Sequence, residues 1–162
     1  MSETKRIYWD SDCLIAWLNK EEERKSICEG TLLAAEQCKV LICISALSYT
    51  EVIKLKEHEN VPKTAEQKIV DFFDNPFFEV YDVDQWVGTR ARFLIWEYGL
   101  DPKDSIHVAT ALLNDIPELN TFDKQLLKLN NKLKLESLPG NLRICQPSIS
   151  TQAELFSSQK LE

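Results

Sequence analysis

The sequence predicts an α/β fold, a three-layer α/β/α sandwich around a mostly parallel central sheet of four or five strands. Short strand-like runs alternate with helix-like runs along most of the chain, which is the pattern of strand–helix–strand units. The run at 40–44 is apolar at every position, as in a strand buried on both faces of a parallel sheet. Right-handed crossovers between parallel strands then place helices on both faces of the sheet.

The first half of the chain contains two strand-like and four helix-like runs. In chain order these are a strand at 6–9, a helix at 12–19, a helix from 21 to about 38, the strand at 40–44, a helix that carries Glu51 and Leu55, and a helix from 64 to 73. The acids at 21–23 favour the start of the second helix, because negative charge suits the N-terminal end of the helix dipole. Ser45 or Ser48 is the expected cap of the helix with Glu51, and Thr64–Gln67 matches a capping box.

The second half of the chain continues the alternation and carries clearer helix boundaries. Its expected elements are a strand at 77–83, helices at 85–98 and 102–113, a strand at 119–122, a helix at 124–129 and a strand at 142–145. Asp84 is the expected N-cap of the longest of these helices, and Gly99 is its expected C-cap. Asp101 followed by Pro102 is a strong start signal for the next helix.

Composition predicts one soluble domain. The chain has 162 residues and is 44% hydrophobic, which excludes disorder as the main state. We expect a single domain over residues 1–147 and a loose tail rich in Ser and Gln over 148–162. No apolar run approaches the roughly 20 residues of a membrane helix, and the N-terminus shows no signal peptide. Five cysteines without a CxxC pair fit a reducing cytoplasm better than a disulfide framework or a zinc ribbon, so we expect a cytoplasmic protein.

Four acids fall where the strands of a parallel sheet end. Asp10 and Asp123 directly follow two strands, and Glu51 and Asp104 lie in helices that follow two others. Ligands bind at this carboxyl edge in open α/β sheets. Carboxylates gathered without thiol or histidine neighbours suit a hard cation, Mg²⁺ or Mn²⁺. Such an ion activates water and stabilises charge on phosphate, so the pattern indicates metal-assisted hydrolysis of a phosphodiester.

Each of the four acids also has a purely structural interpretation. Asp10 and Asp123 would serve as N-caps of the helices that follow them. Asp104 would favour the dipole of its helix, and Glu51 would lie on a solvated face. Four independent coincidences at one sheet edge are less expected than one shared site, so the set is more informative than any of its members.

The four acids lie in four short motifs. In chain order they are a strand with an acid at 7–15 (IYWDSDCLI), a helical Glu at 45–52 (SALSYTEV), an acid opening an alanine-bearing helix at 100–111 (LDPKDSIHVATA) and a Thr-x-Asp at 121–123 (TFD). Together these motifs resemble the PIN domain family, most closely the ribonuclease toxins of VapBC toxin–antitoxin pairs. Each motif is weak alone, but their order and spacing are specific. The resemblance covers about residues 5–147.

The resemblance implies a metal-dependent endoribonuclease, the toxin of a toxin–antitoxin pair. It implies that the metal-binding acids are Asp10, Glu51, Asp104 and Asp123. Thr121 and Ser11 would supply hydroxyls that orient the carboxylates. It further implies RNA products with a 5′-phosphate, a cognate antitoxin as partner and a homodimer.

Two residues beside the predicted acids keep two interpretations each. Asp12 stands where the family more often has Asn, Ser or Thr, and it is either a fifth acid of the site or the cap of the first helix. His107 lies one helical turn after Asp104. It either reaches the site or is a packing or surface residue, which we favour because the family chemistry needs no histidine.

Basic and aromatic residues give weaker signals about partners. The net charge of −7 argues against binding RNA by bulk charge. Four cations are candidates for holding RNA phosphates near the acids, against the default of solvated side chains: Arg90, Arg92, Lys124 and Lys128. Trp17 belongs to the core or lines an antitoxin groove near the early helices. Trp86 and Trp96 belong to the core or to a homodimer surface.

Two other functions compete with the ribonuclease. A PIN fold with an inactive metal site would act as an RNA-binding or protein-binding module. Asp10-Ser11-Asp12 is also the DxD pattern of haloacid-dehalogenase-type phosphatases, which would use Asp10 as nucleophile. That chemistry needs a placed lysine and a later acid pair, and the sequence offers no convincing version of either.

Overall fold

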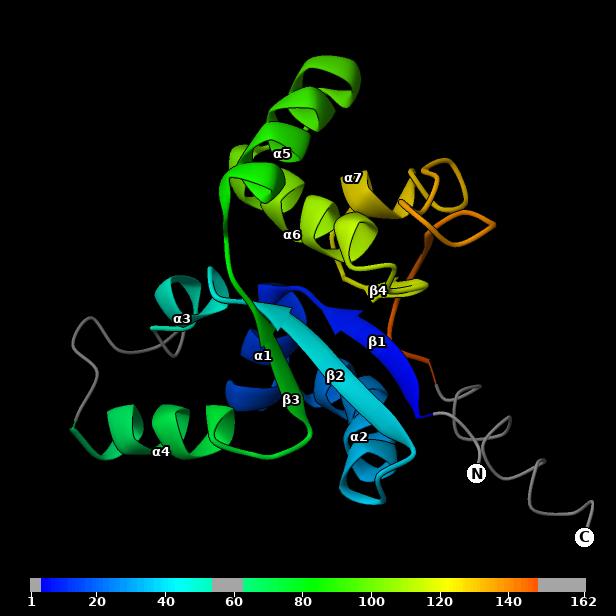
Figure 1. Cartoon of the computed structure of the whole chain (residues 1–162). Helices are drawn as coiled ribbons and strands as arrows, with labels where there is room; N and C mark the ends of the chain where they lie inside the picture. Colours follow the sequence, from blue (N-terminus) through cyan, green and yellow to red (C-terminus); the bar gives the residue numbers. More distant parts are fainter. Residues whose placement is uncertain (1–3, 54–62, 149–162) are drawn as a thin grey trace, which may run out of the picture.

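One parallel sheet organises the chain, which is described by a computed structural model over residues 4–53 and 63–148 (Figure 1). Its strand order is β3-β2-β1-β4-β5, and every neighbouring pair is parallel. The strands are β1 (Lys5–Trp9), β2 (Val40–Ser45), β3 (Phe78–Tyr81), β4 (Glu118–Asn120) and β5 (Arg143–Cys145). The α/β prediction and its mostly parallel sheet are confirmed.

Helices fill the connections between the strands. They are α1 (Ser11–Leu18), α2 (Glu22–Glu36), α3 (Ser48–Glu51), α4 (Lys63–Phe73), α5 (Gln85–Tyr98), α6 (Pro102–Leu113) and α7 (Lys124–Leu127). The predicted caps of the two long helices are confirmed. Asp84 accepts backbone N–H bonds at the start of α5, Gly99 closes α5 with a left-handed φ of 66°, and Asp101 caps α6 ahead of Pro102.

Alternation along β1 separates the two layers of helices. Ile7 and Trp9 pack into a core shared with α1, α2 and α4, whereas Tyr8 points into the opposite core with α5, α6 and α7. Successive strand residues point to opposite faces of a sheet, so one strand serves both cores. Figure 1 shows the same division, with α5, α6 and α7 on one side of the sheet and α1, α2 and α4 on the other.

Two predicted helix starts are wrong in detail. Neither Ser45 nor Ser48 caps α3: Leu47 precedes that helix, and the Ser45 hydroxyl accepts from the Leu47 N–H at 3.1 Å in a local turn. This serine therefore satisfies the loop before α3. The helix α4 begins at Lys63, one residue ahead of the capping box expected at Thr64. The expected extension of α3 to Leu55 lies outside the described residues.

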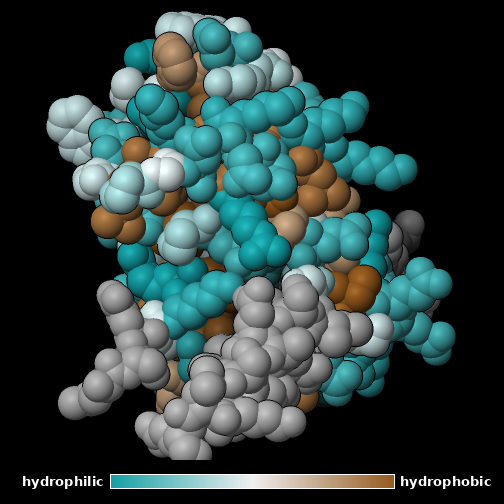
Figure 2. Space-filling model, turned by 90° about the vertical axis from the view of Figure 1, so that its right-hand side faces the viewer, coloured by the Kyte–Doolittle hydropathy of each residue, from teal (hydrophilic) through white to brown (hydrophobic). Residues whose placement is uncertain are grey.

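The helix α5 exposes several large aromatic side chains. Trp86 is 66% exposed, Phe93 52% and Trp96 74%, all on α5, so the core interpretation of the two tryptophans is wrong. These three residues lie on the face of α5 that α6 does not cover. Residue type alone does not reveal which face of the helix is exposed. The face in Figure 2 is mainly hydrophilic, with hydrophobic side chains in separate patches. No helix in residues 4–53 or 63–148 has the length and apolar character to cross a bilayer.

Candidate active site

Asp10 lies at the carboxyl end of β1 and caps α1. It directly follows Trp9, its side chain accepts the Cys13 N–H at 3.2 Å, and it is only 3% exposed. Burial, reinforced by repulsion from Asp12, raises the pKa of Asp10 to about 7. A hydrogen bond from Thr121 and the nearby His107 act in the opposite direction. Asp10 is thus both a helix cap and a buried acid, so the two interpretations of this residue are compatible.

Thr121 and Asp123 follow β4 and approach the same edge of the sheet. The Thr121 hydroxyl accepts the Asp123 N–H at 2.9 Å and bonds the Asp10 side chain. Asp123 caps α7 through the N–H groups of Gln125 at 2.8 Å and Leu126 at 2.9 Å. Both bonds use Oδ1, so the second carboxylate oxygen of Asp123 is not engaged in the cap.

Asp104 lies in the first turn of α6 and is half-buried. Burial raises its pKa to about 6, and the negative charges of Asp123 and Asp101 add to the shift. His107 acts in the opposite direction. The repulsion between Asp104 and Asp123 indicates that the third and fourth predicted acids lie near each other, although they are distant in the sequence.

Two side chains, those of His107 and Ser11, hold Glu51 in the site. The Nε2 atom of His107 lies 2.7 Å from Oε2 of Glu51, and the Ser11 hydroxyl bonds the same oxygen. Burial alone would raise the pKa of Glu51, but the hydrogen bonds from His107 and Ser11, with the charges of His107 and Lys103, outweigh it and lower the pKa. Glu51 is therefore ionised at neutral pH, and it is not a solvated surface residue.

His107 lies in the candidate site, and the surface interpretation of this residue is wrong. It is 2% exposed, and its Nδ1 lies 2.6 Å from the Tyr8 hydroxyl. Its charge also acts on Asp10, Asp12 and Asp104. Its position one turn after Asp104 was the available signal. That spacing puts it on the side of α6 that faces the sheet, where we had favoured a packing role.

Asp12 belongs with the acids and does not cap a helix. Asp10 is the N-cap, and Asp12 occupies the first turn of α1, so the cap interpretation of Asp12 is wrong. Burial raises the pKa of Asp12, with repulsion from Asp123 and Glu51, while Arg24 and His107 act in the opposite direction. Asp12 therefore adds a fifth carboxylate to the electrostatic neighbourhood of the site.

The donor chemistry of this edge fits a hard divalent cation. Burial, with repulsion from neighbouring carboxylates, raises the pKa of Asp10 to about 7 and that of Asp104 to about 6. Mg²⁺ and Mn²⁺ prefer negatively charged oxygen ligands. Within residues 4–53 and 63–148, however, no three His, Cys, Asp or Glu side chains are arranged as ligands of one ion. The fit is thus one of charge and donor type, and an ion would have to draw the carboxylates together.

The predicted RNA-binding cations lie in different surroundings from one another. Arg90 is engaged with Glu136 at 3.6 Å, and Arg92 lies over the Trp96 ring at 5.3 Å. Lys124 and Lys128 are exposed at the two ends of α7, beside Asp123.

Two cations that the sequence did not single out act more directly on the acids. Lys103 lowers the pKa of Glu51, and Arg24 opposes the raised pKa of Asp12. The Arg24 guanidinium also lies over the Phe122 ring at 5.0 Å, next to Asp123. Neither position carries a sequence signal, because only the packing of α2 and α6 brings these side chains to the site.

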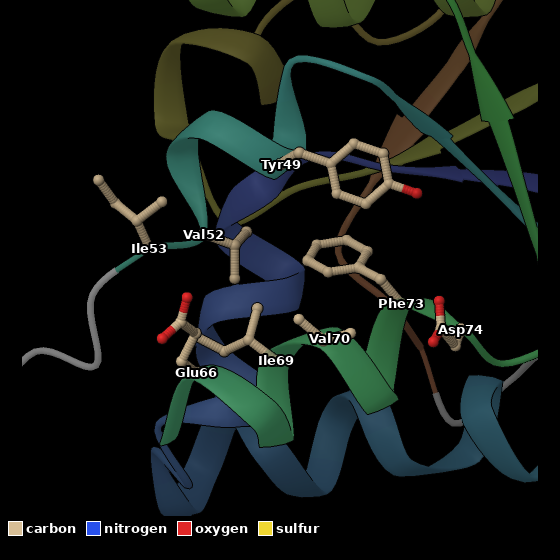
Figure 3. A pocket seen from close by; sticks show the side chains of 8 residues that line it. All are labelled: Tyr49, Val52, Ile53, Glu66, Ile69, Val70, Phe73 and Asp74. Atoms are coloured by element: carbon tan, nitrogen blue, oxygen red, sulfur yellow. The ribbon is translucent and has the colours of Figure 1, made fainter. Parts of the chain in front are cut away.

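An apolar groove lies between α3 and α4 (Figure 3). It has a volume of about 610 Å³. Its lining residues are Tyr49, Val52, Ile53, Glu66, Ile69, Val70, Phe73 and Asp74. Figure 3 shows the apolar side chains of the two elements facing one another, with Glu66 and Asp74 toward the ends of the groove. Trp17 does not line this groove. The Lys25 ammonium lies over the Trp17 ring, 5.2 Å from its centroid.

Comparison with protein families decides the family of the chain. The model of the PIN domain matches residues 7–132, from β1 through α7. The chain belongs to the PIN domain family. The match includes all four predicted PIN motifs and ends before β5, the strand that the sequence predicts at 142–145.

Solved structures with a similar fold come from toxin–antitoxin systems. A chain in a toxin–antitoxin complex from Klebsiella pneumoniae is 24% identical to this PIN domain, with a TM-score of 0.56 over 87% of this chain and 97% of that one. A chain of VapBC2 from Rickettsia felis, bound to a DNA fragment from its promoter, is 17% identical, with a TM-score of 0.58 over 81% and 97%. No curated protein matches the sequence. At these identities the structures establish the shared PIN fold.

Proposed function

We propose that this PIN domain is a metal-dependent endoribonuclease and the toxin of a toxin–antitoxin pair. The observation that carries the proposal is the convergence of five carboxylates at the carboxyl edge of a parallel sheet. Burying negative charge in this way lowers stability unless a cation neutralises it, so a fold that keeps the arrangement is suited to cation binding. PIN family membership supports nuclease chemistry over the phosphatase alternative.

Asp10, Glu51, Asp104 and Asp123 would hold one or two Mg²⁺ or Mn²⁺ ions, and Asp12 would complete the negative cluster. When bound, the ion supplies the positive charge that activates water and stabilises the phosphate in the transition state. Thr121 keeps Asp10 in place through its hydroxyl, and Ser11 does the same for Glu51. Lys103 and Arg24 are suited to hold RNA phosphates at the rim, because they are exposed and their charge reaches the acids.

The products of the reaction test this proposal. Attack of water on phosphorus with release of the 3′ oxygen leaves one fragment with a 5′-phosphate and one with a 3′-hydroxyl. We expect purified protein to cut single-stranded or structured RNA in Mn²⁺ or Mg²⁺, to leave these ends and to stop in EDTA. RNA binding without cleavage, and independent of metal, would instead support the inactive binding module.

A cognate antitoxin is the proposed protein partner, and the groove between α3 and α4 is its proposed docking surface. The groove is apolar along its length, with acids Glu66 and Asp74 at its margins, so it suits an apolar segment flanked by basic residues. The toxin–antitoxin neighbours support a partner of this kind. Val70→Asp would place a charge on the groove wall and should weaken binding of the antitoxin at least tenfold, while Val83→Asp, exposed outside the groove, should not.

A homodimer is the proposed assembly, through the aromatic face of α5. Trp86, Phe93 and Trp96 recur at helical spacing and are more than half exposed, and exposed apolar patches of this kind mark protein interfaces. The proposed occupant is the same helix of a second copy, since an isologous contact pairs identical patches. Light scattering after size exclusion should give twice the mass of one chain, and Phe93→Lys should give a monomer.

A further inference from the structure

Three side chains from three elements, Tyr8, His107 and Glu51, form a hydrogen-bonded relay in the site. Tyr8 of β1 and His107 of α6 meet with 2.6 Å between the Tyr8 hydroxyl and Nδ1, and the rings pack edge to face at 5.8 Å between centroids. On its other side, His107 meets Glu51 of α3 with 2.7 Å between Nε2 and Oε2. Tyr8 is fully buried and His107 nearly so. The relay therefore connects the inner core to an acid of the site.

The geometry of the three groups fixes which nitrogen of His107 donates to Glu51. A carboxylate oxygen accepts hydrogen bonds, so Nε2, at 2.7 Å from Oε2 of Glu51, carries a proton whether or not the ring is charged. The buried Tyr8 hydroxyl bonds Nδ1 on the other side of the ring. Burial raises the pKa of Tyr8 well above its ordinary value, so the phenol keeps the proton that it donates.

The relay contacts Glu51 through Oε2 and not through Oε1. Both His107 and Ser11 bond Oε2, and among the residues that the structure describes no hydrogen bond reaches Oε1. A carboxylate held through one oxygen has its rotation restricted while its second oxygen stays available as a ligand. Hydrogen-bonded partners of this type orient metal-binding carboxylates and raise metal affinity.

We propose that His107, oriented by Tyr8, is a positioning residue that holds Glu51 through Oε2 so that Oε1 is presented to the cation. The inference rests on the proposed function, because it assigns a role toward the ion that the acids would bind. His107 does not touch RNA or the reacting phosphate in this role. It acts through Glu51, and Tyr8 acts through His107.

Metal affinity without RNA tests the proposal independently of catalysis. Titration calorimetry of the full chain with Mn²⁺ should show binding that weakens roughly 10–100-fold in His107→Leu. His107→Gln, which keeps an N–H donor on a side chain of similar reach, should recover most of that loss. Tyr8→Phe should weaken binding severalfold. Tyr81→Phe, which removes a tyrosine hydroxyl bonded to Glu79 and Arg6, should bind Mn²⁺ like the wild type.

The outcomes separate this inference from the proposed function. Absence of Mn²⁺ binding by the wild type would overturn both. Wild-type binding with unchanged or tighter binding in His107→Leu would overturn the positioning role alone. A Tyr8→Phe loss no larger than that of Tyr81→Phe would overturn the relay.

A spectroscopic measurement tests the tautomer in the wild type, where no variant has to fold. The chain has two histidines, so the ¹⁵N signals of His107 are assigned by comparison with His58→Gln. In metal-free protein, we expect a protonated Nε2. A protonated Nδ1 with a bare Nε2 would overturn the proposal, because that ring could not donate to Glu51.

Discussion

Asp10 and Asp12 repel each other across the first turn of α1, and this repulsion adds to burial in raising the pKa of Asp10 to about 7. Asp104 and Asp123 repeat the relationship across two other elements, where burial and repulsion raise the pKa of Asp104 to about 6. The metal-free protein thus carries an electrostatic strain at the site. That strain makes the consequences of neutralising single acids, or of adding a cation, predictable.

Replacing Asp10 with Asn should stabilise the metal-free protein at high pH. The pKa of Asp10 rises from 3.8 to about 7 on folding, so the folded state binds more protons between these values. Stability from this group is consequently lost as the pH rises through that window. Asn is as good an N-cap as Asp, so the bond to the Cys13 N–H is retained.

Urea unfolding in EDTA measures the effect of Asp10→Asn. We expect the variant to be more stable than the wild type by roughly 2–4 kcal/mol at pH 8 and by little near pH 4. A gain of the same size at both pH values would show that it does not come from the charge. A loss at pH 8 would contradict the account of a strained carboxylate.

Metal binding should weaken as the pH falls. Carboxylates must be deprotonated to act as ligands, and Asp10 and Asp104 take up protons near pH 7 and 6. Between pH 8 and pH 5.5 we expect the Mn²⁺ affinity to fall by roughly 10–100-fold, with proton release on binding at neutral pH. Calorimetry in two buffers of different ionisation enthalpy measures both quantities. An affinity independent of pH would exclude these two acids as ligands.

Lys103 should contribute more to RNA binding than Arg90. Lys103 is exposed and its charge reaches Glu51, whereas Arg90 is engaged with Glu136. With EDTA present to prevent cleavage, Lys103→Gln should lower RNA affinity about threefold and reduce the dependence of log K on log salt by about 1. Arg90→Gln is the matched control, and fluorescence anisotropy is the measurement. Equal losses in the two variants would mean that RNA does not approach from the side of α6 that carries Lys103.

Asp84→Ala should destabilise the fold without affecting the site. The Asp84 side chain accepts the N–H groups of Trp86 and Val87, both at 2.9 Å, at the start of α5. Loss of such a cap costs about 1 kcal/mol. The midpoint temperature of thermal unfolding should fall by about 2–4 °C, while the Mn²⁺ affinity stays unchanged. A change in metal affinity would mean that the start of α5 is coupled to the acids.

Much of this fold was predictable because its boundaries are set by local chemistry. Asp84, Gly99 and the Asp101-Pro102 pair mark helix ends through contacts within a few residues, and those predictions are confirmed. The one-turn helix α3 was less predictable, since Ser45 bonds the Leu47 N–H in the preceding loop and Ser48 lies within the helix. The family resemblance rested on four motifs, and the match over residues 7–132 contains them all.

The candidate site was predictable in its acids and less so in its surroundings. Acids that follow strands converge because parallel strands end at one edge, which is a consequence of topology. The roles of His107, Arg24 and Lys103 depend on how α6 and α2 pack against that edge, and no short-range pattern encodes this. The exposure of Trp86 and Trp96 is likewise set by which face of α5 meets α6.

The most direct test of the central claim is RNA cleavage by the wild type and by Asp104→Asn, purified identically, in Mn²⁺ with and without EDTA. Asp82→Asn is the matched control, because Asp82 is exposed and follows β3 at the same sheet edge. The account predicts EDTA-sensitive cleavage by the wild type and Asp82→Asn, and a loss of at least a hundredfold in correctly folded Asp104→Asn. Equal cleavage by the wild type and Asp104→Asn would contradict it.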